Sequence, residues 1–194
     1  MRPEQFRQTW TANEDNLSPI DRDSLIELNL KSSTVDFLTI AGLPFDAAPF
    51  LSFVQNKADS YNTINRLTKH YDFLEAEYDK YIVIGSCSDG DVIAINTDDN
   101  DQIVWLDHED YFSSRFFNSS INSLAECLVI YRNFVQTIQK DNGENAYMNT
   151  DFTDQQFETL KQKLSTADNR AMTEDGFWKS DLEMELAMRQ DNRK

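Results

Sequence analysis

The segment from Ile121 to Ile138 has the most regular apolar pattern in the chain, and it limits how the neighbouring residues can fold. Apolar side chains recur there at spacings of three and four residues, which places them along one face of a helix. The preceding Asn118, Ser119 and Ser120 are all common residues at helix N-termini. We expect this helix to pack across the sheet predicted just before it. The apolar positions are Ile121, Leu124, Leu128, Tyr131, Val135 and Ile138.

Three short apolar segments before this helix predict β-strands. Tyr81–Gly85, Asp91–Asn96 and Gln102–Leu106 are rich in β-branched and other apolar residues. The polar segments Ser88–Asp91 and Thr97–Asp101 separate them, and the Asp-Gly pair in the first favours a hairpin turn. Short consecutive strands with polar turns indicate an antiparallel meander. Together with the long helix, they predict an α+β fold.

Helices and a short strand are also predicted before the meander. In Pro3–Thr11 two aromatic residues lie four apart, which places them on one helical face. Asp21–Leu30 fits a helix or a loop. Ser33 is predicted as the N-cap of a helix that ends at Gly42, which readily adopts the left-handed conformation that ends helices. The apolar residues of Phe50–Val54 favour a short strand.

The last quarter of the chain is predicted to be helical. Thr153 and Gln156 match a capping box, and an apolar stripe follows them. A final helix is expected from Phe177 onwards. Residues 151–190 therefore read as a helical C-terminal region. Since no internal repeat and no linker rich in Gly, Ser or Pro interrupts the sequence, residues 1–194 are predicted to form a single domain.

The charge balance limits the possible partners. The chain of 194 residues has 34 acidic and 18 basic side chains, a formal net charge of −16. Such a surface repels nucleic acid, whose binding requires cations, and anionic membranes for the same reason. It would attract a basic protein partner. The alternative is that the acidic surface serves solubility alone.

Cysteine usage and hydropathy favour the cytoplasm. Cys87 and Cys127 are far apart and form no Cys-x-x-Cys pair, which is typical of buried thiols in a reducing compartment. No apolar run approaches the roughly 20 residues that a membrane span requires. The N-terminal residues lack the apolar core of a secretory signal peptide. We therefore expect a cytoplasmic protein.

Few residues are candidates for catalysis or metal binding. His108 lies among acidic residues after the third predicted strand, yet neighbours on a strand point to opposite faces, so metal ligands would not converge there. Cys87 and His108 both lie at strand ends, so a Cys–His pair across the meander is geometrically possible. Cys127 falls within the long helix and is expected in the core. His70 has no distinctive context.

Phosphate-binding and hydrolase motifs are missing from the sequence. It contains no Walker loop and no Gly-x-Gly-x-x-Gly pattern. Gly85–Ser88 lacks the second glycine of a Gly-x-Ser-x-Gly elbow. Asp98, Asp99 and Asp101 could bind calcium, but they depart from EF-hand spacing and fit a solvated turn better. No cofactor, metal or catalytic residue is predicted.

The order of several short motifs resembles the SUKH superfamily, which joins bacterial toxin-immunity proteins to fungal regulators of cell-wall glucan synthesis. The resemblance is clearest over residues 35–138, and an aromatic pair in the acidic last helix is similar to that of the longer bacterial members. The motifs are Phe37-Leu38 before Gly42-Leu43-Pro44, Ile82–Gly85, Asp89-Gly90-Asp91, Ile103–Glu109, Phe117–Ser120 and Phe177-Trp178.

The resemblance implies helices around a curved antiparallel sheet and a binding module without shared catalytic residues. It implies an immunity protein that neutralises a polymorphic toxin by protein–protein interaction. A nuclease toxin would fit the acidic charge, because nuclease surfaces are basic. A regulatory scaffold of the glucan-synthesis type is the alternative, and an enzyme using Cys87 and His108 is a third hypothesis that only the residue types support.

Turn placement predicts where a basic partner would dock. In a three-strand meander, the first turn and the segment after the third strand lie at the same end of the sheet. Their acidic residues should therefore form one patch, separate from Asp98, Asp99 and Asp101 at the other end. The candidate partner-binding residues are Asp89, Asp91, Asp107, Glu109 and Asp110.

Overall fold

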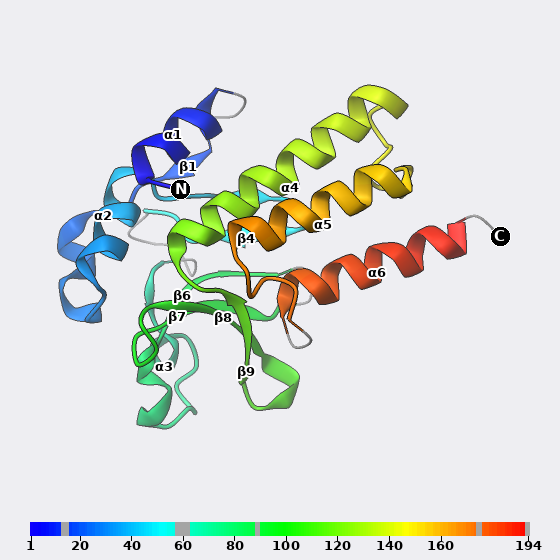
Figure 1. The fold of residues 1–194 in the computed structure, drawn as a ribbon. Helices are drawn as coiled ribbons and strands as arrows, with labels where there is room; N and C mark the ends of the chain where they lie inside the picture. The colour runs from blue at the N-terminus through cyan, green and yellow to red at the C-terminus, as the bar shows by residue number, and fades with distance from the viewer. Residues whose placement is uncertain (13–15, 57–62, 88–89, 174–175, 193–194) are drawn as a thin grey trace.

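An antiparallel sheet forms the centre of the protein in the computed structural model, which describes residues 1–12, 16–56, 63–87, 90–173 and 176–192 (Figure 1). The strand order is β3-β4-β6-β7-β8-β9, and β5 pairs with β6. A separate ladder joins β1 (Leu17–Ser18) to β2 (Leu43–Pro44). The strands of the main sheet are β3 (Asp46–Ala47), β4 (Leu51–Phe53), β5 (Asn65–Arg66), β6 (Tyr81–Ser86), β7 (Val92–Asn96), β8 (Gln102–Asp107) and β9 (Ser113–Asn118).

The predicted meander is confirmed. β6 pairs with β7 and β7 with β8, both antiparallel, and the chain continues into β9 as a fourth consecutive strand. The register places Val83 opposite Ala94 and Ala94 opposite Val104. Sequence reasoning missed β9, because its first half is polar and carries no alternating apolar pattern.

Helices cover one side of the sheet, and a smaller helical segment covers the other. Figure 1 shows α4 and α5 above the strands and α3 below them. The helical C-terminal region is present as predicted. The α-helices are α1 (Pro3–Thr11), α2 (Ser32–Ile40), α3 (Leu67–His70), α4 (Ile121–Asn142), α5 (Asp154–Ala167) and α6 (Phe177–Asn192), and the 3₁₀ helices are η1 (Arg22–Leu28), η2 (Ala76–Lys80) and η3 (His108–Asp110).

The long amphipathic helix is α4, and its apolar face is buried as expected. Leu124, Leu128 and Tyr131 are inaccessible to solvent, whereas Val135 is only half-buried. Ser120 caps the helix, since its hydroxyl accepts a hydrogen bond from the backbone N–H of Ser123. The capping box predicted at the start of α5 is also present.

Two predicted helix boundaries had different outcomes. α2 begins one residue before Ser33, and Lys31 occupies the N-cap position, so Ser33 lies within the helix. Gly42 follows α2 with a φ of +67°, as predicted. A Cβ atom on Gly42 would lie 2.2 Å from the backbone oxygen of Ser18, so both the conformation and the close approach of strand β1 require glycine.

The strands alternate their side chains between two buried clusters. Ile82, Ile84 and Ile93 point toward α1, α2, α4 and α6 and belong to the larger cluster. Val83 and Val92 point to the opposite face, where residues from α3 and the segment after it cover them. Because both faces are covered, the strands read as nearly continuous apolar runs.

Polar groups tie α6 and the loop before it to the sheet. The Asp168 carboxylate accepts hydrogen bonds from the Ser119 backbone N–H at 2.7 Å and from the Asn118 side chain at 3.1 Å. The Trp178 indole donates to the Asn118 side-chain oxygen at 3.0 Å. Burial alone would raise the pKa of Asp168, yet the hydrogen bonds hold it below its usual value.

Candidate partner-binding site

The candidate site is the corner between β8 and β9, where η3 reverses the chain. Asp107 begins the corner, and its carboxylate accepts hydrogen bonds from the backbone N–H groups of Glu109 at 3.1 Å and Asp110 at 3.2 Å. Its second oxygen accepts from Arg115 at 3.1 Å. Asp107 therefore shapes the corner, while Glu109 and Asp110 are exposed to solvent.

Asp91 lies beside this corner, as the turn geometry predicted, but its carboxylate points inward. The residue is only 7 % exposed. Its oxygens accept hydrogen bonds from the Trp105 indole at 2.6 Å and from the His108 backbone N–H at 3.0 Å, and one oxygen lies 2.6 Å from His108 Nδ1. Asp91 thus joins the start of β7 to β8 and η3.

These contacts shift the pKa values of both ionisable partners. Burial alone would raise the pKa of Asp91, but the hydrogen bonds from His108 and Trp105 hold it below its usual value. The hydrogen bond to Asp91 raises the pKa of His108. The carboxylate and the imidazolium therefore stabilise each other's charged form.

The remaining predicted acidic residues have different positions. Asp89 lies outside the described residues. At the other end of the meander Asp98 and Asp99 are exposed, whereas Asp101 is buried and accepts a hydrogen bond from the Lys31 backbone N–H at 2.7 Å. Asp101 therefore does not belong to the second exposed acidic patch, because it anchors the N-terminus of α2.

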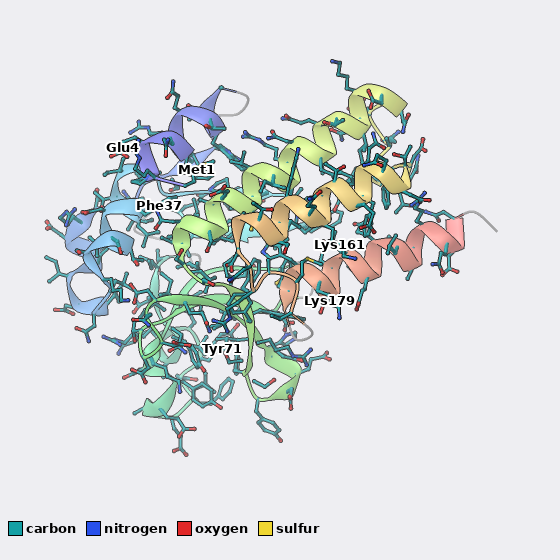
Figure 2. The ribbon with its side chains drawn as sticks, in the orientation of Figure 1. Met1, Glu4, Phe37, Tyr71, Lys161 and Lys179 are labelled. Atoms are coloured by element: carbon teal, nitrogen blue, oxygen red, sulfur yellow. The ribbon has the colours of Figure 1, made fainter. Side chains whose placement is uncertain are left out.

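The structure adds an aromatic cluster that the sequence reading did not identify. The ring of Phe112 lies 4.7 Å from that of Tyr71 and 6.4 Å from that of Phe73. The Tyr78 hydroxyl donates to the Tyr111 backbone oxygen at 3.0 Å. The cluster joins the corner to the segment 71–78, on the side of the sheet away from α4, where Figure 2 labels Tyr71. No local pattern predicts this pairing.

A cavity opens next to the cluster. It has a volume of about 230 Å³, and Tyr71, a member of the aromatic cluster, lines one of its walls. His70, Gly90 and Val92 also line it. Burial lowers the pKa of His70, so its ring is neutral at physiological pH. The cavity therefore presents apolar and neutral polar groups beside the acidic corner.

The candidates for catalysis are placed as follows. Burial raises the pKa of the Cys127 thiol to about 12, so it is protonated and unreactive near neutral pH. Its sulfur contacts the Asn118 side chain at 3.5 Å. The ring of His108 is held by Asp91.

Within the described ranges, no three His, Cys, Asp or Glu side chains gather as a metal site would require. In the same ranges no helix is long and apolar enough to span a membrane.

Comparison with known proteins gives one family. The family model described as SUKH-4 immunity protein matches residues 9–184. The match runs from within α1 into α6, so it includes the whole sheet, the corner and the aromatic cluster. No curated protein and no solved structure matches the chain.

Proposed function

Because the chain belongs to the SUKH-4 immunity protein family, we propose that it neutralises a toxin by binding the toxin domain directly. The protein acts by occupying a surface of the toxin, without catalysing a reaction. The observation that supports this binding site is the exposed pair Glu109 and Asp110, which η3 places at the corner between β8 and β9. The charge of Asp107 adds to the same acidic surface.

The charge of the chain supports a basic toxin, and a nuclease is the class that fits best. A nuclease must attract an anionic substrate, so its substrate-binding surface is basic. A chain with a net charge of −16 is attracted to that surface and can exclude the nucleic acid from it. Complementary charge also accelerates association, which benefits a protein that must intercept a toxin quickly.

Asp91 has a supporting role in this proposal. Its carboxylate is enclosed by Trp105 and His108, so it fixes the position of the corner without contacting the partner. Asp107 similarly fixes Glu109 and Asp110 through their backbone N–H groups. Glu109 and Asp110 thus contact the toxin, whereas Asp91 and Asp107 hold the corner in place.

The test is association kinetics with a purified toxin domain, for which the reading frame next to this gene is the first source to clone. The double variant Glu109→Lys with Asp110→Lys should slow association about 10-fold or more at low salt and weaken its salt dependence. The matched control is Asp98→Lys with Asp99→Lys, which makes the same charge change at the other end of the meander. Equal rates for both double variants would reject the corner as the site. Failure of the wild-type protein to bind or protect against the toxin would reject the function.

A further inference from the structure

Two exposed aromatic side chains flank the acidic corner. Tyr111 is 87 % exposed and Phe73 is 72 % exposed, the highest values among the large apolar side chains that the structure describes. They come from segments far apart in the sequence, but the two segments contact each other: the ring of Phe73 packs on Phe112, and Tyr78 packs on Phe112 and donates a hydrogen bond to the Tyr111 backbone oxygen. Exposed aromatics gathered at one place are typical of protein-binding surfaces.

The backbone at the corner keeps Tyr111 exposed at an energetic cost. Tyr111 has a φ of 49° and Phe112 a φ of 55°, so two consecutive bulky residues adopt the left-handed conformation. Such residues rarely adopt it, because the Cβ atom crowds the backbone. The reversal buries Phe112 against the sheet and leaves the Tyr111 ring in solvent. Strained backbone of this kind is commonly retained where function requires it.

The charge around the two rings specifies the occupant. The segments 69–80 and 107–115 contain seven acidic and three basic residues. One of the three bases, Arg115, is already paired with Asp107. A second copy of this acidic chain would be repelled, whereas a basic protein surface with apolar side chains complements both the charge and the rings.

From these observations we infer that Phe73 and Tyr111 are the apolar anchors of the toxin-binding surface, which extends from the corner across residues 71–78. The occupant is the basic surface of the toxin domain, so this inference rests on the proposed function. The rings supply apolar contact area that holds the complex together, and the surrounding carboxylates attract the basic toxin and accelerate association. The cavity lined by Tyr71 and His70 lies next to this surface, against strands β4, β6 and β7.

The experiment measures dissociation of the complex with the purified toxin domain from the neighbouring reading frame. Phe73→Ala and Tyr111→Asn should each dissociate about 10-fold faster or more, with association rates close to that of the wild-type protein. Asn is chosen at position 111 because it tolerates the left-handed conformation, so the corner keeps its shape. Tyr111→Phe should dissociate at nearly the wild-type rate, since it retains the ring.

Phe50 provides a matched control on the other side of the molecule. It is also an exposed aromatic residue with a left-handed backbone, and its ring stacks on Tyr147, which contacts Tyr131 of α4 and Glu185 of α6. Phe50→Asn should therefore leave dissociation unchanged. Thermal unfolding of each variant checks that the fold is intact.

Each outcome has a distinct meaning. If Phe73→Ala and Tyr111→Asn dissociate faster than the wild-type protein and Phe50→Asn does not, the inference is supported. If the wild-type protein binds and these variants dissociate at its rate, or if Phe50→Asn is the variant that weakens the complex, the anchors are misplaced while the proposed function stands. A wild-type dimer that Tyr111→Asn converts to monomers would make this surface a self-interface and overturn the inference. A wild-type protein that does not bind the toxin removes both proposals.

Discussion

On one face of the central sheet, Ile82, Ile84 and Ile93 lie under four α-helices, and the aromatic side chains between these helices are buried. On the other face, Val83 and Val92 lie under α3, η2 and the corner, and the aromatic cover ends in the exposed rings of Phe73 and Tyr111. The first face has the larger buried apolar area and therefore supplies most of the stability. The second is thinly covered, and we assign it the binding role.

The largest effect should come from the helical face. Leu128→Ala removes a fully buried side chain from α4 and should lower the free energy of unfolding by about 2–5 kcal/mol. Leu106→Ala, an equally buried leucine on the other face, should cost less, because the thinner cover there can collapse into the space. Urea denaturation of both variants measures the difference. A larger loss of stability for Leu106→Ala would show that the helical face is not the main source of stability.

A second effect on the helical face depends on pH. Burial raises the pKa of Asp181 to about 7; the Tyr131 hydroxyl donates to it at 2.9 Å, and Glu185 and Tyr147 lie in the same buried group. Since the folded-state pKa is above the usual 3.8, its stabilising contribution is complete below about pH 3.8 and is lost as the pH rises through about 7.

Asp181→Asn tests this pH dependence. The variant should be more stable than the wild-type protein at pH 8 by about 2–4 kcal/mol, because each unit of pKa shift corresponds to about 1.4 kcal/mol. At pH 4 the two proteins should unfold at similar denaturant concentrations. An unchanged difference between the two pH values would show that Asp181 is not buried against α4 as described.

On the binding face the Asp91–His108 pair should have a smaller effect. The pKa of Asp91 is lowered and that of His108 is raised, so the pair stabilises the fold fully between about pH 3.8 and 6.5. Its contribution declines as the pH falls through the folded-state pKa of Asp91 or rises through that of His108.

Asp91→Asn should lower stability by about 1–2 kcal/mol at pH 6, since it weakens hydrogen bonds to a charged acceptor. The pKa of His108, followed by NMR titration of its ring, should fall toward 6.5 in this variant. Asp107→Asn leaves the His108–Asp91 contact in place, so it serves as the control and should shift this pKa much less. A His108 pKa that does not respond to Asp91→Asn would contradict the described contact.

The smallest effect on stability should be at the exposed anchors. Tyr111→Asn and Phe73→Ala should change the free energy of unfolding by about 0.5 kcal/mol or less, because little buried area is lost. These variants should weaken toxin binding, whereas Leu128→Ala should lower stability without changing the affinity of the folded fraction. If substitution at positions 73 and 111 lowers the free energy of unfolding by more than about 2 kcal/mol, the two rings belong to the core.

The elements that were predicted correctly depend on residues close together in the sequence. α4 follows from apolar spacing, the capping box of α5 from Thr153 and Gln156, and the left-handed turn after α2 from Gly42. β9 and the N-cap Lys31 were missed because neither has a local signature. Backbone preferences and periodicity act over a few residues, so the sequence records them directly.

Local sequence patterns were enough to predict the α+β composition, the antiparallel meander, the long helix and the position of Asp91 beside the corner, and the net charge follows from composition. Which carboxylates face solvent could not be predicted in this way, because it depends on the tertiary fold. Asp91 is enclosed by Trp105 and His108, and Asp101 by the backbone of Lys31, 70 residues earlier, whereas Glu109 and Asp110 have no such enclosure and stay exposed. Exposure depends on partners that are distant in sequence, and folding alone brings those partners together.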